Sequence, residues 1–199
     1  MAGRFSNLSK VPDEPAAKLL AQQNIHLSAD LSAPASASVE EVLDELAAKN
    51  ADMDLLKCVA VILPPRERVW WACLAARDIV GEGPENETRS LRAAEAWVFR
   101  PTDETRNEAI HSMEFAHIDD ETVKCAMGVM YSDGTLGTGD MAQLEAPAGA
   151  GAIAAFAMNI EALTTRLDEY DTYLHELIDR GIDIARGGNG KPKAQGKDL

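Results

Sequence analysis

The chain has 199 residues, 46% of them hydrophobic, and a formal net charge of -14 at pH 7. This balance is typical of one folded globular domain, because a chain of this length can bury about 70% of its unfolded surface. The acidity argues against nucleic-acid binding, since a polyanion would meet a repulsive mean field. No segment has the apolar run of a signal peptide or a membrane span, so we expect a cytoplasmic protein without membrane insertion.

The first part of the chain combines one short predicted helix, over residues 16–23, with a predicted linker. Residues 28–38 are small, polar and proline-containing, which is typical of a linker. Ser38 then begins a helix as part of a capping box, because Glu41 follows three residues later. We therefore expect residues 1–37 to form a flexible segment and linker.

Helical periodicity continues to the end of the chain, whereas alternating strand patterns are nearly absent. A helix over 51–63 is stopped by Pro64 and Pro65, which also begin the next helix over 65–80. A helix capped by Asn86 is expected next. The later predicted helices cover residues 86–100, 101–116, 120–132, 147–167 and 168–188.

These patterns predict an all-α fold of about seven to eight helices. Their lengths and short loops favour a single multi-helix bundle or a short irregular helical solenoid. Residues 38–188 form the expected helical domain, and residues 189–199 form a disordered basic tail. No repeat with a period of 34 to 45 residues is evident, which favours the bundle.

Motifs for metal or cofactor chemistry are missing from the sequence, so we expect no metal site and no cofactor. The histidines are scattered, and the three cysteines, embedded in apolar stretches, have no CxxC spacing and are expected to be buried and reduced. The glycine-rich stretch SDGTLGTGD, residues 132–140, lacks the Lys-Ser/Thr pair of a phosphate loop. Asp133 and Gly134 are its candidate functional residues, although the pattern favours a long turn between two helices over a phosphate loop.

The densest constellation lies in LPPRERVWWACLAARD, residues 63–78. Adjacent helical residues diverge by roughly 100°, so Trp70 and Trp71 must serve different faces of the helix. Arg66 stands four residues before Trp70, a spacing that permits its guanidinium to lie over the indole. Two interpretations stay open: the aromatic pair packs between helical layers, or part of it is an interface hot spot.

The same stretch, with AAEAWV and its following proline, the SDGTL loop and the PAGAGAIAAFAM helix, resembles an uncharacterised bacterial protein family. The resemblance covers roughly residues 60–188. It implies a loose association with type VI secretion gene clusters and hence a cytoplasmic accessory or adaptor protein. The family loop reads SGGSL where this chain has SDGTL, which weakens a catalytic interpretation of the loop. The matching positions are Leu63, Pro64, Pro65, Arg66, Trp70, Trp71, Ala76, Arg77, Glu95, Trp97, Pro101 and Gly134.

Our leading hypothesis is a non-enzymatic protein-interaction module, because the matching positions contain no nucleophile with a base. Its expected partner is a protein, such as a secretion component or an effector. The alternative is an enzyme or small-ligand-binding protein with a pocket between the Trp70/Trp71 helix and the 132–140 loop. Homo-oligomerisation through the AGAGAIAAFA helix is a third hypothesis. The interaction candidates are Arg66, Trp70, Trp71, Arg77, Glu95 and Trp97, and in the alternative Arg66, Arg77 and Glu95 supply the polar groups of the pocket.

Overall fold

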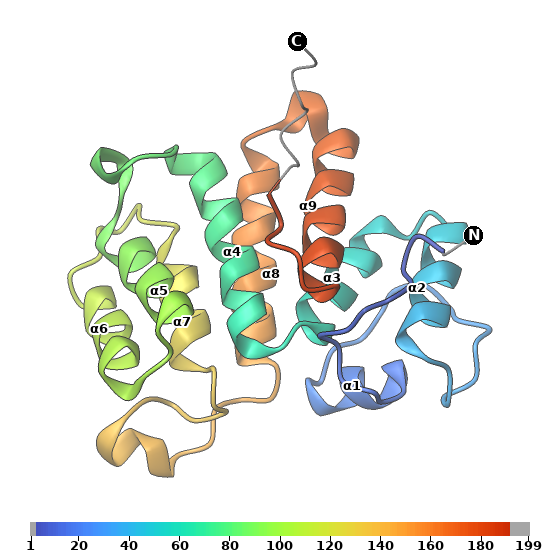
Figure 1. Ribbon diagram of the computed structural model, residues 1–199, viewed down its shortest axis with the longest axis horizontal. Helices are drawn as coiled ribbons and strands as arrows, with labels where there is room; N and C mark the ends of the chain where they lie inside the picture. The colour runs from blue at the N-terminus through green and yellow to red at the C-terminus, as the bar shows by residue number, and fades with distance from the viewer. Residues whose placement is uncertain (1–2, 192–199) are drawn as a thin grey trace.

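The computed structural model describes residues 3–191, and it is all-helical (Figure 1). No strand occurs within these residues; the only β pairing among them is an isolated bridge between Thr135 and Glu145. The α-helices of this part of the chain are α1 Ala16–Gln22, α2 Val39–Ala48, α3 Asp52–Ile62, α4 Pro65–Val80, α5 Arg89–Phe99, α6 Asp103–Met113, α7 Val123–Met130, α8 Ala150–Thr164 and α9 Tyr170–Ala185.

Nine α-helices within residues 3–191 exceed the seven to eight that we predicted. The shortest, α1 and α7, have 7 and 8 residues, a length at which an isolated helix is marginal in water. Both are held by packing, because Leu19 of α1 and Val129 of α7 are buried in the core. Both segments were expected to be helical from the sequence, and tertiary contacts stabilise them at this short length.

The architecture is a helical bundle built around α4. This helix packs against α5, α7, α8 and α9, an arrangement in which one central helix contacts four others. Figure 1 shows α3, α4, α8 and α9 standing together in the middle, with α5, α6 and α7 on one side and α1 and α2 on the other. A central helix of this kind distinguishes a bundle from a solenoid, in which each unit contacts only its neighbours.

The junction between α3 and α4 follows from its two prolines. Leu63 is extended (ψ 131°), as the residue before a proline prefers, and Pro65 is the first residue of α4. The capping box of α2 is also present, with Ser38 Oγ accepting from Glu41 N and Glu41 bonding back to Ser38 N.

The cap predicted for α5 was wrong. Asn86 belongs to a short 3-10 helix, Pro84–Asn86, and Thr88 caps α5 instead by accepting a hydrogen bond from Leu91 N at 3.1 Å. The physical reason is that Thr88 also meets the Thr122 hydroxyl, a contact that anchors the start of α5 to the residues before α7. Asn and Thr are both favoured at the N-cap, and the tertiary contact selects Thr88 although Asn is intrinsically the better cap.

Small side chains let α8 approach α4 and α7 closely. Ala152, Ala154 and Ala155 of α8 are buried, and α8 packs against both neighbours. The AGAGAIAAFA stretch therefore uses most of its small-residue surface inside the chain, while Ile153 is 52% exposed.

Residues 3–37 pack along the helical domain and are fastened to it at several points. Phe5 is 1% exposed, and Lys10 N donates to Ala185 O of α9 at 2.9 Å. In the segment before α2, the backbone N–H groups of Ser28 and Ala29 donate to Asp54 Oδ2 at 2.8 and 2.7 Å. The boundary that we expected at residue 37 thus does not coincide with a break in packing.

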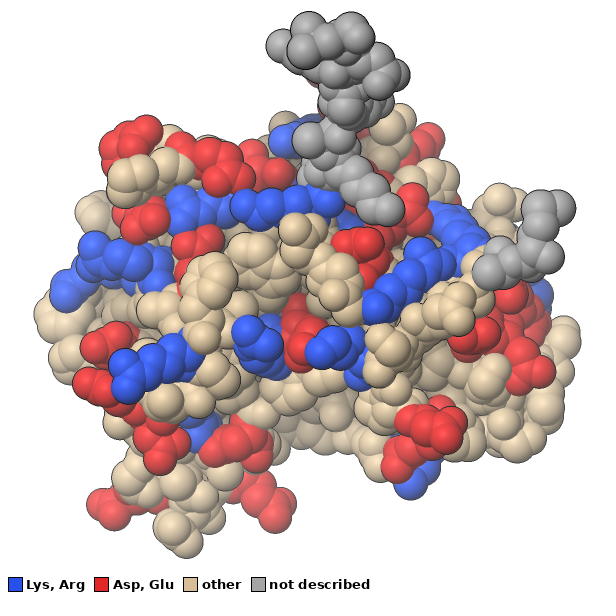
Figure 2. Space-filling view, viewed as in Figure 1, with Lys and Arg blue, Asp and Glu red and all other residues tan. Residues whose placement is uncertain are grey.

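The tail expected over residues 189–199 lies outside the described residues from 192 onward. Residues 189–191 of this tail are described, and Asn189 contacts α4, because its carbonyl oxygen accepts a hydrogen bond from Trp70 Nε1. None of the helices described has the length and apolar character needed to cross a membrane. Acidic and basic side chains are interspersed on the face shown in Figure 2.

Candidate functional site

The two adjacent tryptophans lie on different faces of α4. Trp71 is fully buried, and its Nε1 donates to Leu177 O of α9 at 3.0 Å. Gly181, one turn further along α9, allows this approach, because a Cβ there would lie only 3.2 Å from Trp71 Nε1. Trp71 is therefore part of the core that joins α4 to α9.

Trp70 is half-buried and forms one wall of a surface groove, here called the Trp70 groove. Its ring meets Phe99 edge-on, with ring centroids 5.9 Å apart and an interplanar angle of 61°. Phe99 is 72% exposed although it is a large aromatic residue. The groove has a volume of about 270 Å³ and is lined by Lys10, by Arg66, Glu67 and Trp70 of α4, by Val98 and Phe99 of α5, and by Ile184 and residues 187–189.

The charges around the Trp70 groove are mainly basic. Arg66 Nε donates to Val98 O at 2.6 Å, so its guanidinium does not stack on the indole as its spacing suggested. The cation over the Trp70 ring is Lys191, whose Nζ lies 6.0 Å from the ring centroid. The acidic group of the lining, Glu67, lies 3.8 Å from Lys10 Nζ. The groove therefore combines an aromatic wall with a cationic rim.

Arg77 and Glu95 lie together, away from this groove, and tie α4 to α5. Arg77 donates to the Glu95 carboxylate at 2.8 and 2.5 Å and also to Glu87 at 2.9 Å. The hydrogen bond to Glu95 is the main reason that the pKa of Arg77 is raised, and the bond to Glu87 adds to it. Trp97 of α5 is 7% exposed. Arg77 and Glu95 therefore link two helices, while Trp97 packs in the core. Of the six interaction candidates, only Arg66 and Trp70 line the groove.

The loop candidates Asp133 and Gly134 hold a turn together. The Asp133 carboxylate pairs with Arg106 of α6 and accepts a hydrogen bond from Thr135 N at 2.9 Å. Burial opposes ionisation of Asp133, but the hydrogen bonds from Thr135 and Arg106 outweigh it and lower its pKa. Gly134 has a φ of 82°, a left-handed conformation that favours glycine. Both residues thus have a structural task in the loop.

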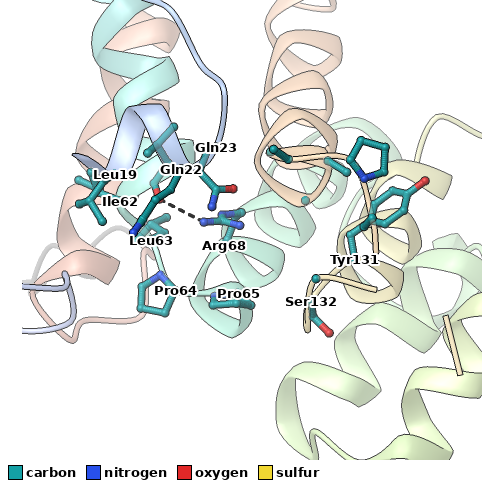
Figure 3. Close-up of a pocket in the computed structure, with 18 of the residues that line it drawn as sticks. Leu19, Gln22, Gln23, Ile62, Leu63, Pro64, Pro65, Arg68, Tyr131 and Ser132 are labelled. Atoms are coloured by element: carbon teal, nitrogen blue, oxygen red, sulfur yellow. Dashed lines mark hydrogen bonds between the residues drawn. The ribbon is translucent and has the colours of Figure 1, made fainter. Parts of the chain in front are cut away.

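A larger cavity, here called the Arg68 pocket, was missed by the sequence reasoning. It has a volume of about 420 Å³ and lies between the end of α1, the α3–α4 junction and the residues that lead into α8 (Figure 3). Its lining includes Leu19, Gln22 and Gln23, residues 61–65, Arg68, residues 131–132, Gly134 and residues 146–151. The pocket touches the start of the loop that we had expected to border a ligand site, but Arg66, Arg77 and Glu95 do not line it.

Arg68 is the charged group of this pocket. Its side chain as a whole is half-buried, whereas its Nε has no accessible surface and no hydrogen-bond partner among the described residues. Its Nη2 donates to Val61 O at 3.1 Å. Burial lowers the pKa of Arg68 to about 10. A signal was present in the sequence, because Arg68 stands four and seven positions before the buried Ala72 and Ala75 on one helical face.

Other chemistry-bearing groups are dispersed. Cys58, Cys73 and Cys125 are free and buried, and burial raises the pKa of Cys58 to about 12. Among residues 3–191, no group of three or more His, Cys, Asp or Glu residues is placed to hold a metal ion. The three cysteines therefore supply no metal site within the described residues.

The comparisons with known proteins identify a family and no activity. A family model described as a family of unknown function, DUF6931, matches residues 42–185. The chain matches no curated protein and no solved structure.

Proposed function

We propose that this chain, which belongs to the family of unknown function DUF6931, is a non-enzymatic protein-interaction module that binds its partner in the Trp70 groove. The observation that carries the proposal is Phe99, which is 72% exposed and packs edge-on against Trp70. Exposed aromatic residues beside an arginine are typical of binding hot spots.

The partner that fits this groove is a protein segment with an apolar side chain next to a carboxylate. Trp70, Phe99 and Ile184 supply apolar walls for the first group. Arg66 and Lys191 supply positive charge for the second, while the acid of the lining, Glu67, lies beside Lys10. Such local complementarity matters on a chain with a net charge of -14, because it selects where an acidic partner can approach.

We extend the proposal to an accessory or adaptor role in a bacterial type VI secretion system, acting in the cytoplasm. The support for this part is the resemblance of the LPPRE, VWWACL and AAEAWV stretches. The proposed partner is then a secretion component or an effector. An enzymatic role has weaker support, because Arg77 and Glu95 pair with each other while Arg66 lies in a different groove.

The test is a pull-down with the full chain, followed by titration calorimetry with the purified partner. We expect Phe99→Ser to weaken binding about 30-fold or more, the loss of a hot-spot residue, while the helical circular-dichroism signal is unchanged. Leu167→Ser is the matched control, because Leu167 is 68% exposed and does not line the groove. Equal affinity of Phe99→Ser and the wild type, or an equal loss in the control, would refute the proposal.

A further inference from the structure

We propose that the Arg68 pocket binds a small molecule through its phosphate group. This inference is independent of the Trp70 groove, since Arg68 and Trp70 line different cavities. It rests on a half-buried arginine without an acidic partner and on the start of α8, which no side chain caps; the two lie next to each other in the same pocket.

Arg68 differs from the other arginines that are buried or nearly so. Arg106 pairs with Asp133 and Arg180 with Asp78 at the edges of the core. Arg77 has Glu95. Arg68 has no carboxylate within ion-pair distance among residues 3–191 and bonds instead to a backbone carbonyl. A half-buried guanidinium without a carboxylate partner has lost part of its hydration, and an anion that binds its accessible nitrogens from the pocket would compensate for that loss.

The start of α8 adds a second positive group beside it. This helix has 15 residues, no side-chain cap and no acidic residue in its first turn. The N–H of Ala150 donates to Pro147 O at 3.0 Å, whereas the next N–H groups of this first turn have no partner inside the helix and, with the helix dipole, attract anions. A Cβ on Gly151 would lie 3.5 Å from Arg68 Nη1, so the guanidinium stands directly against this first turn. The Arg68 guanidinium and the positive end of the α8 dipole are thus adjacent, and no acidic side chain among the described residues lies between them.

The approach of α8 to the rest of the pocket is enforced by Gly149. Its φ is 78°, and a Cβ at this position would lie 2.1 Å from Gln23 O at the end of α1. A residue with a side chain would therefore push the first turn of α8 away from α1. Figure 3 shows Gln22, Gln23 and Arg68 on one side of the pocket, with Tyr131 and Ser132 on the other. Gly149 therefore keeps the start of α8 close to Arg68, and no acidic side chain of the lining neutralises either positive group.

The lining also matches an anionic ligand in charge. The chain has 33 acidic residues against 19 basic ones, yet no Asp or Glu lines the Arg68 pocket. Its volume of about 420 Å³ lies within the range of small-molecule sites. A planar guanidinium beside helix N–H groups suits a tetrahedral oxyanion, and the space beyond them accommodates the remainder of a small phosphorylated compound.

The test measures the melting temperature and the heat of binding of the full chain with inorganic phosphate, glycerol 3-phosphate, ribose 5-phosphate and, as the carboxylate alternative, succinate. Ionic strength is held constant with chloride. We expect saturable stabilisation by phosphate compounds, because a ligand that binds only the folded state raises the melting temperature. Tighter binding of a phosphate ester than of inorganic phosphate supports the proposal, whereas equal binding of the two would overturn the assignment to a phosphorylated small molecule. Tighter binding of succinate would overturn the phosphate assignment.

Two variants test the site itself. Arg68→Met keeps the length of the side chain and removes its charge, and we expect binding of phosphate to weaken about tenfold or more while the unliganded protein melts at a higher temperature. Gly151→Asp places a carboxylate beside Arg68 and should also raise the melting temperature and abolish the response to phosphate. Arg66→Met, on the other face of α4, is the control and should bind phosphate as the wild type does. Absence of saturable binding to the wild type, or unchanged binding in both pocket variants, would overturn the inference.

Discussion

Gly181 of α9 is a position at which one added methyl group should disturb the packing of the core. A Cβ there would lie 2.2 Å from Val59 Cγ1 of α3, where carbon atoms in ordinary contact stay about 3.5 to 4.0 Å apart. The shortfall is therefore about 1.5 Å. Val59 and Trp71 are both fully buried, and a valine in a helix strongly prefers one rotamer, so neither neighbour can yield without moving its helix.

The expected cost of Gly181→Ala follows from two opposing effects. Alanine favours a helix over glycine by about 1 kcal/mol, whereas overpacking a dense core costs typically about 1 to 3 kcal/mol and more when backbone must shift. We expect a net loss of about 2 kcal/mol in the free energy of unfolding, since the contact is far below the ordinary distance. For a chain of this length, that loss lowers the melting temperature by roughly 4 to 8 °C.

The assay is urea unfolding followed by circular dichroism, with Val59→Ala and the double variant measured alongside. Val59→Ala removes Cγ1 and is destabilising alone, but it also makes room for the new methyl group. The double variant should therefore be more stable than the sum of the single effects predicts, by about 1 kcal/mol or more. A Gly181→Ala protein as stable as the wild type, or strictly additive effects, would refute the close packing of α3 on α9.

Two further predictions concern ionisation. Burial acts to raise the pKa of Asp54, but hydrogen bonds from Lys57, Ala29 and Ser28 outweigh it and lower this pKa. The stabilisation from Asp54 is therefore complete above about pH 5, where the unfolded chain is also ionised, and it is lost as the pH falls through the lowered pKa. Urea unfolding should show a shallower loss of stability below about pH 4 for Asp54→Asn than for the wild type, and equal slopes would contradict this. The three buried thiols should not react with Ellman's reagent until the protein unfolds, because burial raises the pKa of Cys58 to about 12 and also raises that of Cys73; fast labelling of the native protein would show that a thiol is accessible.

The sequence predicted best those features of the fold that neighbouring residues determine. The Pro64-Pro65 junction and the Ser38 capping box depend on backbone restrictions and on side chains three residues apart, so local sequence is enough to predict both. The cap of α5 was wrong because Thr88 is selected by its contact with Thr122, 34 residues away. The packing of residues 3–37 likewise depends on distant partners, such as Asp54 for Ser28.

The candidate sites show the same division within α4. Arg66 and Trp70 are one helical turn apart and share a face, whereas Arg68 lies two residues from either and points away from them. The spacing thus determines that the helix presents two sets of residues, but not which set becomes buried. That choice is made by α1 and by residues 131–151, which enclose Arg68, and by α5 and the residues after α9, which border Trp70. An arginine that packs on an apolar helix face needs an anionic partner, and only the folded chain shows whether that partner is another side chain or a ligand.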